Sequence, residues 1–157
     1  MEQISIPFNY NSLGRVDFIA DVLTGDCKSF KSVWFKLDSG SDFTTISCDD
    51  LYNLGYTRKF LEGCAYHATS ASTASSDIRL HYINNISLKF EYREIQSCRI
   101  FFALDSQLRS LFGSDILKYF NREVNYDEGM LWLTRTKKAP GLSEGELPLQ
   151  IYTIEGK

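Results

Sequence analysis

Residues 35–46 read Phe35-Lys36-Leu37-Asp38-Ser39-Gly40-Ser41-Asp42-Phe43-Thr44-Thr45-Ile46. Apolar residues alternate at Val33, Phe35 and Leu37, which predicts a half-buried strand, and Asp38-Ser39-Gly40 forms the turn that leaves it. Such a turn can hold a carboxylate in a cleft, because a hydroxyl hydrogen-bonds neighbouring backbone and glycine lets a backbone N–H come close. By average composition this tripeptide arises by chance roughly once in ten chains of this length. A solvated turn is therefore the alternative.

A second feature lies further along the chain, where Leu111-Phe112-Gly113 places two apolar residues before a glycine. A short helix is expected over 114–121. A hairpin follows, with strands at 123–126 and 130–134 that are joined through Asp127-Glu128-Gly129.

The rest of the chain reads mainly as short strands. A compact helix is expected after Ser47, because Ser47 and Asp50 have capping-box spacing and Gly55 suits the helix end. Further strands are expected at 4–8, 15–23, 32–37, 43–47, 64–69, 78–83, 86–92 and 95–104. The sequence therefore predicts a mainly β domain with one or two short helices.

Two stretches interrupt this pattern. Residues 69–76 are all small and lack an apolar anchor, which is typical of a hairpin tip or a loop over a cleft, or of an ordinary solvated loop. Residues 136–146 read as a linker before a last apolar segment, 147–154. We therefore expect one domain over 1–135, and a linker with a C-terminal segment over 136–157 that could supply a strand at a dimer interface.

Composition and charge exclude several classes of function. The 157 residues carry 17 Lys and Arg against 20 Asp and Glu, a net charge of −3, which lacks the basic excess of a nucleic-acid-binding protein. No basic and apolar leader begins the sequence, and no apolar run approaches the ~18 residues of a membrane span. We expect a cytoplasmic protein with neither a nucleic-acid nor a membrane partner.

The metal ligands and nucleophiles available are few. Cys27, Cys48, Cys64 and Cys98 form no C-x-x-C pair, so buried reduced thiols are expected rather than a zinc site or a disulfide framework. The two histidines, at positions 67 and 81, lie in no zinc-binding or nucleophile motif. No glycine-rich phosphate loop is present, so we expect neither a metal nor a cofactor.

Together, the Asp38-Ser39-Gly40 turn, the small-residue loop and the Leu111-Phe112-Gly113 element resemble the retropepsins, the single-lobe aspartic proteases of retroviruses and their cellular and bacterial relatives. The resemblance spans about residues 15–134. It implies a closed, barrel-like β lobe with a flap hairpin, in which Asp38 is the catalytic residue. It also implies support of the active site by Ser39, Gly40, Leu111, Phe112 and Gly113, and substrate binding by Ser41, Asp42, Thr69, Ser70, Ala71, Ser72 and Thr73.

The resemblance further implies a reaction that needs two aspartates. One acts as a base on water and the other as an acid on the scissile carbonyl, and two carboxylates ~3 Å apart share one proton because they cannot both ionise cheaply. This chain has one Asp-Ser-Gly, so an aspartic endopeptidase acting on polypeptides would be a homodimer with one Asp38 from each protomer. The alternatives are a retropepsin-like dimerisation or peptide-binding module with an idle dyad, and a small β-barrel binding protein with a chance tripeptide.

Overall fold

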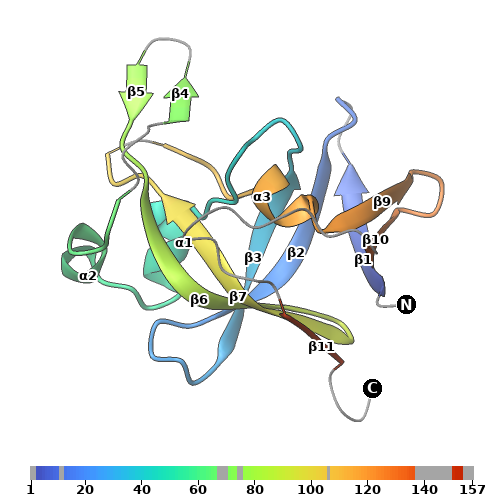
Figure 1. Ribbon diagram of the computed structural model, residues 1–157, viewed down its shortest axis with the longest axis horizontal. Helices are drawn as coiled ribbons and strands as arrows, with labels where there is room; N and C mark the ends of the chain where they lie inside the picture. The colour runs from blue at the N-terminus through green and yellow to red at the C-terminus, as the bar shows by residue number, and fades with distance from the viewer. Residues whose placement is uncertain are drawn as a thin grey trace.

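Alternation of apolar and polar residues organises the chain into one large sheet (Figure 1). The computed structural model describes residues 3–10, 13–66, 71–73, 76–105, 107–136 and 150–153. The strands are β1 (Gln3–Tyr10), β2 (Val16–Leu23), β3 (Phe30–Leu37), β4 (Ala71–Thr73), β5 (Ser76–Ile78), β6 (His81–Phe90), β7 (Arg93–Phe102), β8 (Leu111–Phe112), β9 (Phe120–Asn125), β10 (Met130–Arg135) and β11 (Gln150–Thr153). The helices are α1 (Cys48–Asn53), α2 (Arg58–Glu62) and α3 (Ser114–Leu117).

The main sheet follows the order β11-β7-β6-β2-β1-β10-β9, and β3 joins it beside β2. β4 and β5 form a separate two-stranded hairpin that extends away from the main sheet at the upper left of Figure 1. The mainly β class is confirmed. Over the described residues, the sheet is a curled half-barrel with β9 and β11 at the ends of its path, rather than a closed barrel.

The core lies on the inner face of this curl. Because side chains alternate across a strand, β1 buries Ile4, Ile6 and Phe8 and leaves the residues between them exposed. Three fully buried phenylalanines from β2, β3 and β8 pack together in the centre: Phe18 lies 6.1 Å from Phe35 and 5.4 Å from Phe112, measured between ring centroids.

β8 has only two residues, but its pairing places Leu111-Phe112-Gly113 beside the Asp38-Ser39-Gly40 turn. It runs parallel to β3, with Lys36 opposite Leu111 and Leu37 opposite Phe112. Antiparallel strands can be joined by a short hairpin, whereas parallel strands require a long crossover. Here the crossover contains α1, α2, the β4–β5 hairpin, β6 and β7.

The helices begin where side chains cap them. Ser47 accepts a hydrogen bond from the Asp50 N–H at the start of α1, and Gly55 adopts φ +92° just beyond its end, which confirms the predicted helix. α2 was not predicted, although Thr57 caps it by accepting from the Phe60 N–H. α3 ends at Leu117 and not at 121, because Phe120 already pairs with Arg135 in the β9–β10 ladder.

The hairpin expected near the end of the domain is confirmed as β9–β10, with Gly129 at φ +64°. The expected strand over 43–47 is wrong. Its backbone lies between two partners, so that Thr45 forms isolated bridges to both Phe101 and Leu111. The two strands expected over 78–92 are largely one strand, β6, whose register shifts around Asn85.

The C-terminal segment lies along the domain. β11 pairs antiparallel with β7 of the same chain, with Ile151 opposite Ile95. A part for this segment in a dimer interface stays a prediction, and the expected linker lies almost wholly outside the described residues. Among the helices that the structure describes, none is long and apolar enough to cross a membrane.

Candidate active site

Asp38 lies directly after β3, where two backbone contacts fix the turn. Its N–H donates to the Phe112 carbonyl at 3.0 Å, and its carbonyl accepts from the Ser41 N–H at 3.1 Å. Its Oδ1 accepts from the Gly40 N–H at 3.1 Å. The carboxylate is therefore held at the end of a buried strand and remains partly exposed, with its other oxygen 4.0 Å from the Lys36 Nζ.

The Lys36–Asp38 ion pair is weak. Both side chains are about one third exposed, at 32% and 31%, and solvent screens pairs of this kind. We therefore attribute the position of Asp38 to the backbone contacts of its turn, and not to Lys36.

Gly113 allows the second motif to approach the turn that carries Asp38. A Cβ atom at this position would lie 2.5 Å from the Phe43 carbonyl oxygen and 2.9 Å from the Ser41 carbonyl oxygen. Next to it, the Ser114 N–H donates to the Ser41 carbonyl at 2.8 Å. The glycine is therefore required by close backbone packing against residues 41–43, and its φ of −101° is an ordinary one.

Thr44 and Asp115 connect the two motifs and were not among the site residues predicted from sequence. Thr44 donates to Asp115 twice, from its N–H to Oδ2 at 3.0 Å and from its hydroxyl to Oδ1 at 2.6 Å. The Thr44 hydroxyl also accepts from the Gly113 N–H at 3.0 Å. A threonine and an aspartate, each just beyond one motif, were the only sequence signal for this network.

Burial raises the pKa of Asp115, and the hydrogen bonds from Thr44 only partly offset this. The folded state therefore favours protonated Asp115. This contribution to the free energy of unfolding is complete below the ordinary value of 3.8 and is lost as pH rises through the raised pKa.

We expect the free energy of unfolding of the wild type, relative to that of Asp115→Asn, to decrease as pH rises from about 4 to 7. Asparagine does not titrate in this range. In the wild type, each unit by which folding raises the pKa of Asp115 corresponds to about 1.4 kcal/mol of stability that is lost as the pH rises. Urea unfolding of both proteins across this range measures the difference. A difference that stays constant with pH would contradict the role given to burial.

Other predicted site residues surround the same turn. The Ser41 hydroxyl donates to the Phe43 carbonyl at 2.8 Å, whereas Asp42 and Ser39 are exposed. Phe112 is fully buried beneath the turn, and Leu111 is partly buried. The supporting role of Ser39 and the substrate-binding roles of Ser41 and Asp42 stay predictions.

The predicted flap residues are described in part. Thr69 and Ser70 lie outside the described residues. The backbone of Ala71, Ser72 and Thr73 forms β4, which pairs with β5. A strand hairpin therefore stands where a small-residue tip was expected, and its function as a flap stays a prediction.

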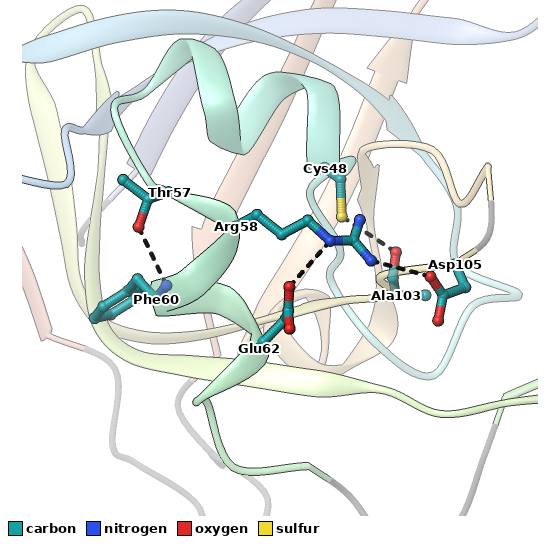
Figure 2. A network of polar contacts seen from close by, with 7 residues as sticks. All are labelled: Cys48, Thr57, Arg58, Phe60, Glu62, Ala103 and Asp105. Carbon is teal, nitrogen blue, oxygen red and sulfur yellow. Dashed lines mark hydrogen bonds and ion pairs between the residues drawn. The ribbon is translucent and has the colours of Figure 1, made fainter.

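Cys48, the cysteine nearest to Asp38 in sequence, lacks the lowered pKa of an activated nucleophile. The Cys48 thiol donates to the Ala103 carbonyl at 3.2 Å, and Figure 2 shows it next to Arg58, which bridges Glu62 and Asp105. Burial raises the pKa of the Cys48 thiol, an effect that the positive charge of Arg58 only partly offsets. A catalytic cysteine requires the opposite change.

The four cysteines are free thiols, but they are less buried than expected. Cys98 is buried, Cys48 and Cys64 are partly buried, and Cys27 is exposed, because it occupies the turn between β2 and β3 with φ +61°. His81 is buried, and its Nδ1 lies 3.0 Å from the Cys64 carbonyl oxygen, so this ring nitrogen contacts backbone and not a thiol. Within the described residues, no group of three or more His, Cys, Asp or Glu side chains could hold a metal ion.

A cavity of about 1010 Å³ lies beside the turn, between the start of α1, the exposed side of β3 and residues 107–110. Lys36 lines it, but Asp38 does not. Ser110 closes one wall, because its hydroxyl donates to Asp50 at 2.6 Å and accepts from the Ser47 N–H at 3.0 Å. These bonds hold Ser110, the residue before β8, whereas the Thr44 hydroxyl holds Gly113, the residue after it.

Comparison with known proteins identifies the fold. No protein-family model matches the sequence, and neither does a curated protein. The structure is similar to the crystal structure of a retropepsin-like aspartic protease from Rickettsia conorii, with a TM-score of 0.56 and 16% sequence identity, over 98% of this chain and 94% of that chain. The chain therefore has a retropepsin-like fold, as its sequence motifs predict.

Proposed function

We propose that the protein is an aspartic endopeptidase that acts as a homodimer, with one Asp38 from each protomer. The observation that carries the proposal is the position of Asp38 in a retropepsin-like fold. Its partly exposed carboxylate stands at the end of β3, and Gly40, Phe112 and Ser41 hold its turn. A carboxylate held in this way is suited to proton transfer.

The reaction follows from two such carboxylates that share a proton. The ionised one removes a proton from a water molecule, which then attacks the scissile carbonyl carbon. The protonated one hydrogen-bonds to the carbonyl oxygen and transfers its proton as the tetrahedral intermediate forms. The two aspartates exchange roles when the intermediate collapses and the leaving nitrogen takes up a proton.

The chain supplies one of these carboxylates, so the second comes from another copy. A two-fold axis beside Asp38 brings the two carboxylates together and builds one cleft from two identical halves. The exposure of Asp38, at 31% of its side chain, agrees with a half-site that a partner covers.

The substrate class follows from the strand hairpin. We assign β4–β5 as the flap, with an extended polypeptide held between it and the Asp38 turn by main-chain hydrogen bonds, as an added strand. Alternate side chains of the substrate would then face the same side of the cleft.

Dilution tests the shared site. Specific activity is expected to fall in proportion to protein concentration below the dimer dissociation constant, because mass action removes the species that holds both aspartates. A peptide-cleavage assay run beside sedimentation over about a thousandfold dilution measures both quantities. Constant specific activity in samples that sediment as monomer would contradict a site built from two copies.

Pepstatin binding separates the endopeptidase from a small β-barrel binding protein with a chance tripeptide. This aspartic-protease inhibitor is expected to saturate the protein at one molecule per two chains, because a single cleft lies on the two-fold axis. A dimer that binds peptides without cleaving them would instead be a retropepsin-like binding module.

A further inference from the structure

A second group of apolar side chains lies outside the main core. It contains Leu80, Phe101 and Ala103, which are buried, and Phe43, Tyr82 and Leu108, which are partly buried. Within it, Phe43 lies 4.5 Å from Phe101 and Phe101 lies 5.8 Å from Tyr82, measured between ring centroids. The Arg99 guanidinium lies 4.4 Å above the Tyr82 ring. We call Phe43, Phe101, Tyr82 and Arg99 the aromatic ladder.

The ladder begins at the Asp38 turn and extends along β6 and β7. Phe43 belongs to the same loop as Asp38, and the Phe101 N–H donates to the Thr44 carbonyl at 2.9 Å. β6, which carries Tyr82, begins three residues after the β4–β5 hairpin ends. The ladder therefore lies between the candidate catalytic loop and the base of the hairpin.

Alternation along β7 separates the ladder from the core. Cys98, Ile100 and Phe102 of this strand pack into the main core, so Arg99 and Phe101 point to the other face. The same face continues onto Tyr82, which pairs with Phe101 across the two strands.

Arg99 provides a cation with a fixed orientation. Its Nε donates to the Asn84 Oδ1 at 2.7 Å, and its guanidinium lies over the Tyr82 ring. In the part of the chain that the structure describes, the carboxylates that form ion pairs do so with Lys36 and Arg58 and not with Arg99. A guanidinium held this way is pre-organised for a bidentate contact with a carboxylate.

We propose that the aromatic ladder binds two side chains of an extended polypeptide substrate: an apolar side chain packs against Phe43, and an acidic side chain forms an ion pair with Arg99. This inference rests on the proposed function and specifies its substrate class. In an extended peptide, side chains two residues apart lie on the same face and are separated by roughly 6.6 Å. Phe43 packs against Phe101, with 4.5 Å between the ring centroids. Phe101 and Arg99 have this two-residue spacing, because both lie on β7.

Peptide binding to the Asp38→Asn variant tests the inference without turnover. The probes are fluorescein-labelled octapeptides with one central phenylalanine and one glutamate. In one probe the glutamate lies two residues before the phenylalanine, and in another it lies two residues after it. Matched control probes replace this glutamate with lysine, or move the glutamate to the position directly beside the phenylalanine. By fluorescence anisotropy at low salt, the best probe with glutamate two residues away is expected to bind roughly fivefold more tightly than its lysine counterpart. The probe with adjacent glutamate is expected to lose this advantage, because its carboxylate faces the other side.

Charge reversal at Arg99 identifies the residue responsible. In the Asp38→Asn background, Arg99→Glu is expected to reverse the preference in favour of lysine, and Arg99→Lys to keep a reduced preference for glutamate. Lys59→Glu makes the same charge reversal on exposed α2 and is expected to leave the preference unchanged. Circular dichroism establishes that each variant is folded.

The outcomes separate the inference from the proposed function. A preference for glutamate that survives Arg99→Glu, or equal binding of all probes, would overturn the ladder as a specificity surface, whether or not the wild type cleaves peptides. An Arg99-dependent preference in a wild-type protein that cleaves none of the probes would support the ladder and count against the endopeptidase.

Discussion

Replacement of Asp38 by asparagine is expected to reduce peptide hydrolysis by at least roughly a thousandfold, while the protein remains folded and dimeric. The amide has nearly the same size as the carboxylate, and its oxygen can still accept from the Gly40 N–H, which lies 3.1 Å from the Asp38 Oδ1. It cannot remove a proton from water. Because both copies of the site carry the change, neither carboxylate remains.

Turnover of a peptide library by the wild type and by Asp38→Asn measures this effect, and sedimentation monitors the dimer. Asp127→Asn is the matched control, because Asp127 is exposed in the turn between β9 and β10; it is expected to keep full activity. Hydrolysis by Asp38→Asn at more than a trace would rule out Asp38 as the catalytic residue.

Gly113→Ala is expected to be the most damaging single-methyl substitution in the site. The new Cβ would lie 2.5 Å from the Phe43 carbonyl oxygen and 2.6 Å from its carbonyl carbon. These are backbone atoms of the loop that follows Asp38, so relief of the clash moves that loop. We expect a loss of about 1–3 kcal/mol or more in the free energy of unfolding, together with a large loss of activity.

Gly63→Ala controls for the loss of a glycine. A Cβ there would lie 3.5 Å from the nearest atom, the Phe60 carbonyl oxygen, at an ordinary φ of −83° at the end of α2. Urea unfolding of the two variants is expected to show little change for Gly63→Ala and the full loss for Gly113→Ala. Equal free energies of unfolding would mean that the loop after Asp38 can move to accommodate a Cβ atom at position 113 without loss of stability.

The elements that local sequence determines were predicted well. The alternation in β1, β2 and β3 corresponds to their buried and exposed faces. The cap at Ser47 and the glycine turn of the β9–β10 hairpin specify local geometry within a few residues. The resemblance in sequence motifs also indicated the retropepsin-like fold, which the structural comparison bears out.

Competition between neighbouring elements was not visible in the sequence. Residues 43–47 have the composition of a strand, but Thr45 makes one bridge to Phe101 and another to Leu111. The predicted second helix reached to 121, but the pairing of Phe120 with Arg135 ends it early. In each case a partner distant in sequence overrode the local propensity.

Only the tertiary structure decided how the candidate site is held together. The parallel pairing of β3 with β8 and the bonds between Thr44 and Asp115 join residues about 70 positions apart. The aromatic ladder likewise joins Phe43 to Phe101. Such contacts form when the chain closes a long loop, and their geometry depends on the packing of everything between. Local sequence therefore determined which residues could carry the chemistry, whereas long-range packing determined which of them meet.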